Sequence, residues 1–188
     1  SQGEVIRPTI QLALETALQQ LGIKDRIKLA SRTDAGVHAQ GQVAHFDCSP
    51  EVLANISDLH RAINRYLPED IAVQAIQTNV GHEFHCRQST KWRWYRYKII
   101  NSLARPVFER ETALWVKESL DVDAMDKAAH YLLGQHNFKS MKALNTPVLD
   151  DWCCLTYSSV SFSGHHIVFD VVADRFLYKM VRNLAGLL

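Results

Sequence analysis

The most informative part of this chain reads Ser31-Arg32-Thr33-Asp34-Ala35-Gly36-Val37-His38-Ala39-Gln40-Gly41-Gln42-Val43-Ala44-His45-Phe46. It places one carboxylate, Asp34, between an apolar strand and a turn that contains a glycine. Gly36 permits backbone angles that other residues avoid, so such a turn can hold a reactive side chain at the mouth of a cleft. An isolated Thr-Asp-Ala-Gly run is more often a plain turn, in which the aspartate binds nearby backbone amides.

The neighbours of Asp34 favour a chemical role. Arg32 and His38 lie close to it in the chain, and an adjacent cation would keep the carboxylate ionised and therefore nucleophilic. No serine or cysteine with a convincing base pattern competes for the role of nucleophile. On these residues alone, a turn former and a nucleophile both stay open.

Composition limits the classes of partner. The 188 residues are enough for one domain or two small halves, and 47% of them are hydrophobic. The net charge is only +1. If the protein binds nucleic acid, its basic residues must therefore gather on one face.

No metal or nucleotide cofactor is expected from the motifs. The four cysteines, Cys48, Cys86, Cys153 and Cys154, form no C-x-x-C pair, and free thiols in a reducing cytosol are the expectation. The histidines show no metal-ligand spacing, and the glycines form neither a P-loop nor a dinucleotide fingerprint. No signal peptide or long apolar span occurs, so no membrane role is expected, although a removed transit peptide would also allow an organelle.

Periodicity predicts an α+β protein. Helices are expected over 9–21, 56–66, 121–134 and 176–188, and strands over 26–30, 42–46, 71–78, 91–101, 155–162 and 167–173. Asp121 is the expected N-cap of the third helix and Gly134 its terminator. This order suggests two α+β halves, 1–104 and 105–188, that share an antiparallel or mixed sheet.

The strand expected at 91–101 mixes rings and cations. Alternation would put Lys91, Arg93, Tyr95 and Tyr97 on one face and Trp92, Trp94, Arg96 and Lys98 on the other. Rings can stack on unpaired bases, at ~1–3 kcal/mol per base, while cations hold phosphates. The alternative is an amphipathic strand whose rings fill the core.

The helix expected at 176–188 carries a third basic pattern. Arg175, Lys179 and Arg182 would form one stripe at i, i+4 and i+7, with Leu177, Met180 and Leu184 entering the core on the opposite side. This is an ordinary amphipathic helix or a surface for phosphates, and the pattern alone leaves both open.

Five segments in order resemble the TruA family of tRNA pseudouridine synthases. Besides Ser31 to Phe46, they are Leu67 to Val73, Phe84-His85-Cys86-Arg87 with cysteine in place of the usual alanine, Tyr95-Arg96-Tyr97, and Phe176 to Gly186. The resemblance implies the pseudouridine synthase fold, a mixed, largely antiparallel sheet with flanking helices in two related halves. It also implies cofactor-independent isomerisation of uridine to pseudouridine in the anticodon stem-loop of tRNA, at positions of the 38–40 type.

The resemblance also implies roles for residues. Asp34 would be the nucleophile, attacking either C6 of uracil or C1′ of ribose, Tyr95 would stack on the target base, and Arg182 would pair with Asp34. The expected substrate-binding residues are Arg32, His38, Arg87, Tyr97 and Lys179. The implied partners are tRNA and a second copy in a homodimer, with no membrane, and the implied compartment is the cytoplasm.

The chain departs from the family pattern at a few points. Ser31 stands where glycine is usual, and Arg175 stands where a small residue is usual. The family's first strand and its closing segment have no counterpart here, so we expect a shortened chain and not a naturally minimal enzyme. Two rival hypotheses are a catalytically inactive protein that binds or folds tRNA, and a structural α+β domain with no RNA partner.

Overall fold

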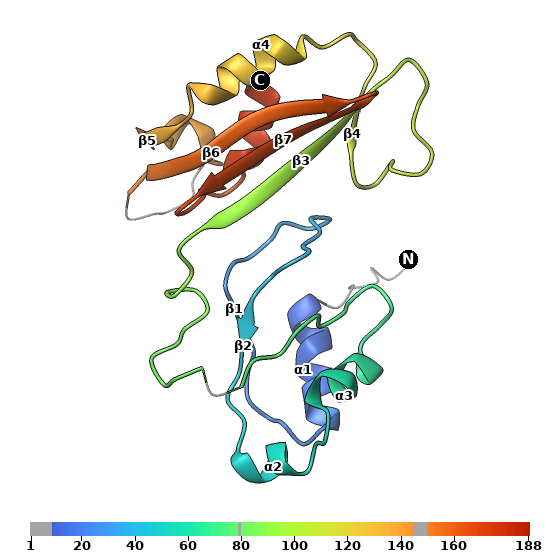
Figure 1. Cartoon of the computed structure of the whole chain (residues 1–188), viewed down its shortest axis with the longest axis vertical. Coiled ribbons are helices and arrows are strands. Elements are labelled where there is room, and N and C mark those ends of the chain that lie inside the picture. The colour runs from blue at the N-terminus through green and yellow to red at the C-terminus, as the bar shows by residue number, and fades with distance from the viewer. Residues whose placement is uncertain (1–8, 79, 145–149) are drawn as a thin grey trace, which may run out of the picture. The chain divides into compact units, whose positions relative to one another are not determined.

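The computed structural model describes residues 9–78, 80–144 and 150–188. The chain forms two compact units, Ser1–Thr90 and Lys91–Leu188 (Figure 1). Each unit has its own hydrophobic core and its own sheet, and each is described by itself.

The regular secondary structure of the first unit is mainly helical. Its elements are α1 (Ile10–Gln20), β1 (Lys28–Leu29), β2 (Ala44–His45), α2 (Pro50–Ala54) and α3 (Leu59–Tyr66). Each helix is capped at its N-terminus by a side chain that accepts a hydrogen bond from a backbone N–H of the first turn; the capping residues are Thr9, Ser49 and Asp58 respectively. The core of this unit consists of buried apolar side chains, namely Ala17, Leu18, Ile23, Ile27 and Ile63.

The helices and strands predicted for the first unit are mostly present, but the strand predicted over 71–78 is wrong. Residues 71–78 form no strand. A side chain of α3 makes hydrogen bonds with the backbone of Val73 that a neighbouring strand would otherwise make. The N–H of Val73 donates to Asn64 Oδ1 at 2.8 Å, and its carbonyl accepts from Asn64 Nδ2 at 2.8 Å. The helix predicted over 56–66 begins later, at Leu59, and α2 was not predicted.

The second unit is built on a five-stranded sheet in the order β4-β3-β7-β6-β5. The strands are β3 (Arg93–Asn101), β4 (Leu114–Val116), β5 (Gly134–Asn137), β6 (Trp152–Ser163) and β7 (His166–Ala173). Strands β3 and β4 are parallel and the other neighbours are antiparallel. The helices are α4 (Val122–His130), α5 (Met180–Leu187) and the short 3-10 helix η1 (Lys139–Met141).

The core of the second unit lies on one face of this sheet. Alternate residues of β7 are almost fully buried: Ile167, Phe169, Val171 and Ala173. Apolar side chains of α4 and α5 join the same cluster, so both helices pack on that face (Figure 1). The strands predicted over 155–162 and 167–173 are confirmed as β6 and β7, which pair with each other, and the Asp121 cap of α4 is also confirmed. Gly134, however, begins β5 instead of ending the helix.

The predicted α+β class, with a mixed and largely antiparallel sheet, is confirmed. The described residues form two separate sheets, so we find no sheet shared by both units. The units divide at Thr90/Lys91, earlier than the expected division at 104/105, because β3 pairs with β7 from Arg93 to Ile100. A structural relation between the two halves stays a prediction.

Candidate functional site

Asp34 lies in the loop that joins β1 to β2. Pairing of the strands continues one step into this loop, where the N–H of Ala30 donates to the Val43 carbonyl at 2.9 Å. The N–H of Val37 donates to the Asp34 carbonyl at 3.1 Å, and Gly36 adopts φ +80°, a region that favours glycine. The short hairpin therefore presents the half-buried Asp34 from a turn, as the sequence predicts.

The two residues expected to flank Asp34 do not form an ion pair with it. Arg32 and His38 are both exposed, and across the described parts of the chain no ion pair joins either of them to the Asp34 carboxylate. The hairpin is instead held next to Asp34 by Gln42, whose Nε2 donates to the Ser31 carbonyl at 3.0 Å.

The alternation predicted along β3 is confirmed, and it separates two kinds of aromatic residue. Tyr95 and Tyr97 are half-buried and pack against the core cluster. The ring of Tyr95 meets that of Phe176 edge to face, with the centroids 5.0 Å apart. The other face carries Trp94, which is 66% exposed.

A charged cluster on this second face was not predicted. Asp170 on β7 accepts two hydrogen bonds from the Arg96 guanidinium, at 2.9 and 2.8 Å, and one from Trp94 Nε1 at 2.9 Å. The guanidinium also lies 5.4 Å from the centre of the Trp94 ring. A cavity of about 480 Å³ lies beside this cluster, and Tyr157 and Val172 complete its lining. Only the pairing of β3 with β7 reveals the contact, so no local sequence signal could have found it.

The basic stripe predicted over Arg175, Lys179 and Arg182 is wrong. Helix α5 begins only at Met180, after Lys179 adopts a left-handed conformation with φ 61°. Arg175 lies outside the helix and pairs with Asp150 at 3.1 Å. Arg182 alone of the three belongs to the helix, where it is exposed next to the buried Met180. The predicted burial of Leu177, Met180 and Leu184 is confirmed.

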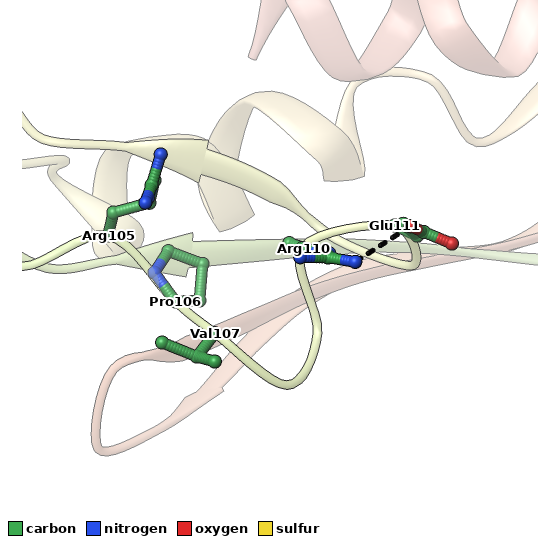
Figure 2. Close-up of a pocket in the computed structure, with 5 residues that line it drawn as sticks. All are labelled: Arg105, Pro106, Val107, Arg110 and Glu111. Carbon is green, nitrogen blue, oxygen red and sulfur yellow. Dashed lines mark ion pairs between the residues drawn. The ribbon is translucent and has the colours of Figure 1, made fainter.

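The candidate residues therefore fall into two groups. Asp34, Arg32, His38 and Arg87 belong to the first unit, and Tyr95, Tyr97, Lys179 and Arg182 belong to the second unit. A second cavity, of about 320 Å³, is lined by one loop of the second unit and contains none of these residues (Figure 2). The lining of that cavity includes an exposed ion pair between Arg110 and Glu111, at 3.5 Å.

The described residues contain no group of three histidine, cysteine or acidic side chains arranged to hold a metal ion. None of their helices has the length and apolar character that crossing a membrane requires.

Comparison with known proteins places the chain in a family. A family profile described as tRNA pseudouridine synthase matches residues 128–188. A protein of Moorella thermoacetica named tRNA pseudouridine synthase A is 41% identical over 189 residues, which cover 100% of this chain and 75% of that protein. Proteins of the same name from Dechloromonas aromatica and Geobacillus kaustophilus are 39% and 38% identical, and the matches cover 68% and 72% of them. The chain therefore belongs to the tRNA pseudouridine synthase A family.

Proposed function

We propose that this chain isomerises uridine to pseudouridine in tRNA. The bond between N1 of uracil and C1′ of ribose breaks, a bond from C5 to C1′ forms, C5 loses a proton and N1 gains one. Atoms and electrons balance, so the reaction uses no oxidant or reductant. The observation that carries the proposal is the 41% identity with a tRNA pseudouridine synthase A along the entire chain.

The proposed nucleophile is Asp34. It is half-buried in a turn whose Gly36 is suited to the backbone angles found there, and the strands on either side hold that turn at its base. Attack on C6 would join the carboxylate to the base, and attack on C1′ would join it to the ribose. Either route breaks the bond between N1 and C1′ and so frees the base from the ribose, after which the base can rotate and rejoin C1′ through C5.

The proposed catalytic partners are Tyr95 and Arg182. The target base must leave its stack, at a cost of a few kcal/mol, and a ring beneath it recovers part of that cost. Tyr95 suits this role because its contact with Phe176 holds the ring in place. Arg182 suits the role of a cation for the catalytic carboxylate, because it is exposed on a helix that Met180 and Leu184 anchor in the core.

The finer assignments rest on the family resemblance. We propose that the substrate is the anticodon stem-loop, that the enzyme acts as a homodimer, and that it works in the cytoplasm. The proposed tRNA-binding residues are Arg32, His38, Arg87, Tyr97 and Lys179. Light scattering of the full chain tests the dimer, and an RNA hairpin with the anticodon stem-loop sequence tests the substrate.

The decisive assay follows from the lost C5 proton. Transcribed tRNA with tritium at C5 of uridine releases the label only when pseudouridine forms, so release by the wild-type chain tests the function. Asp34→Asn should bind tRNA normally and release no tritium. Asp123→Asn, which changes an exposed aspartate of α4, should behave as wild type. Full release by Asp34→Asn would refute the nucleophile, and wild-type binding without release would favour the inactive tRNA-binding protein.

A further inference from the structure

One residue joins the segment Phe84–Arg87 to both strands at the base of the Asp34 hairpin. The backbone N–H of Cys86 donates to His45 Nδ1 at 3.2 Å, and the Cys86 thiol donates to the Lys28 carbonyl at 3.2 Å. Lys28 and His45 are direct partners in the pairing of β1 with β2. The segment is therefore fixed at a single rung of the hairpin.

The surroundings of His45 come largely from the same segment. Its ring meets the rings of Phe84 and His85 edge to face, with centroids 5.9 and 4.9 Å away. Cys86 is only 1% exposed. Since water barely reaches this residue, the Cys86 N–H depends on His45 for its hydrogen bond.

Further hydrogen bonds connect Cys86 and His85 to the residues that follow them. The N–H of Ser89 donates to the His85 carbonyl at 2.8 Å, and the Thr90 hydroxyl donates to the Cys86 carbonyl. The N–H of Arg87 donates to His85 Nδ1 at 3.3 Å. The backbone of Arg87 is thus set by the turn that Cys86 attaches to the hairpin.

We propose that His45 is a positioning residue: its Nδ1 lone pair holds Phe84–Arg87 against the base of the Asp34 hairpin and so places Arg87 for tRNA. This inference rests on the proposed function, in which Asp34 attacks and Arg87 binds substrate. It adds a residue that neither touches the substrate nor takes part in the chemistry.

The contact requires a neutral histidine. A protonated ring carries a hydrogen on Nδ1 and cannot accept from Cys86. Burial lowers the pKa of His45 from 6.5, the charges of His85 and Lys28 lower it further, and Asp47 and Asp25 oppose them. The contact is therefore complete at neutral pH and opens as the pH falls below 6.5 through the lowered pKa.

Two substitutions separate the lone pair from the ring. His45→Phe keeps an aromatic ring and removes the acceptor, whereas His45→Asn removes the ring and places an amide oxygen near the position of Nδ1. Cys86→Ala keeps the N–H and removes only the thiol. The readouts are hydrogen exchange of the Cys86 amide without RNA, the tRNA dissociation constant, and kcat from tritium release.

We expect His45→Phe to speed exchange of the Cys86 amide and to weaken tRNA binding about tenfold, with kcat falling by a similar factor. His45→Asn should keep the amide protected, bind tRNA within about twofold of wild type, and lose the acid limb of the binding profile. Cys86→Ala should bind as wild type. Normal binding and protection in His45→Phe would overturn the inference, and so would an unchanged acid limb in His45→Asn.

The proposed function can fail separately. A wild-type chain that releases no tritium would refute the isomerase, while amide exchange and tRNA affinity would still decide whether His45 places the Arg87 segment.

Discussion

Replacing Asp170 with asparagine should weaken the second unit through the Arg96 and Trp94 contacts. The Asp170 side chain is 13% exposed, and it accepts three hydrogen bonds, two from Arg96 and one from Trp94. Asparagine keeps one acceptor oxygen, but it loses the charge and presents an N–H₂ group to the guanidinium. Both the ion pair and one hydrogen bond are then lost.

The exposure of the pair sets the size of this effect. Removing one partner of a fully buried ion pair costs about 3–5 kcal/mol, and an exposed pair contributes about 0–1 kcal/mol. Asp170 is nearly buried, but the Arg96 side chain is 51% exposed, so water compensates part of the loss. We therefore expect the free energy of unfolding of the second unit to fall by about 2 kcal/mol.

Urea denaturation followed by tryptophan fluorescence measures this loss. With a slope of about 2 kcal/mol per molar urea, the midpoint should fall by about 1 M. All four tryptophans of the chain belong to the second unit, so the fluorescence follows the unfolding of that unit. Asp150→Asn is the matched control, because Asp150 and Arg175 pair at 3.1 Å with 54% and 36% exposed side chains. Its midpoint should move by less than about 0.3 M. Equal shifts in the two variants would refute the reasoning.

The pH dependence of Asp170→Asn gives a second check. Burial raises the pKa of Asp170 and is the largest single effect, but the bonds from Arg96 and Trp94 and the Arg96 charge together outweigh it. The pKa therefore lies below its ordinary value of 3.8. The stabilisation is complete above that value and is lost as the pH falls through the lowered pKa. The deficit of Asp170→Asn should shrink below pH 3.8, and a constant deficit down to the acid limit would count against the ion pair.

Two further substitutions test other contacts of the second unit. Asp126→Ala should lower the melting temperature of the second unit by about 5–10 °C. The variant loses two hydrogen bonds, since Asp126 Oδ1 accepts from the Val160 N–H at 2.7 Å and from the Ser159 hydroxyl at 3.0 Å. Calorimetry measures the change, and Asp123→Asn is the control. Lys179→Gly should raise the melting temperature, since relief of φ 61° returns about 1 kcal/mol. It should also weaken tRNA binding and flatten its salt dependence by about one phosphate contact; a lower melting temperature would contradict the backbone argument.

The predictions that succeeded rest on local signals. Helix α4 begins where Asp121 accepts from the Ala124 N–H at 3.0 Å, and Met125 and Ala129, which lie one helical turn apart, are both buried. Capping and helical periodicity both act within a few residues, so the sequence around each position contains the relevant information.

The failures have non-local causes or come from one unusual residue. The segment 71–78 has the composition of a strand, but the side chain of Asn64 forms hydrogen bonds with both the N–H and the carbonyl of Val73. The helix expected from 176 begins four residues later, after the left-handed Lys179. The helical spacing of Arg175, Lys179 and Arg182 therefore does not place them on one helix face, because Arg175 lies before the helix and pairs with Asp150.

The register of β3 against β7 shows which face of β3 packs on the core, a question that the alternation of its residues leaves open. Alternation predicts two mixed faces, but pairing with β7 places Tyr97 opposite the buried Phe169 and Arg96 opposite Asp170. The face with Tyr95 and Tyr97 therefore packs against the core, whereas Trp94 on the other face is 66% exposed. Tyr95 is half-buried and held by Phe176, so its ring is fixed before any RNA binds. In the role proposed for Tyr95, a base that stacks on it would lose its own freedom without also having to order the ring, which is the advantage that a platform for a flipped base requires.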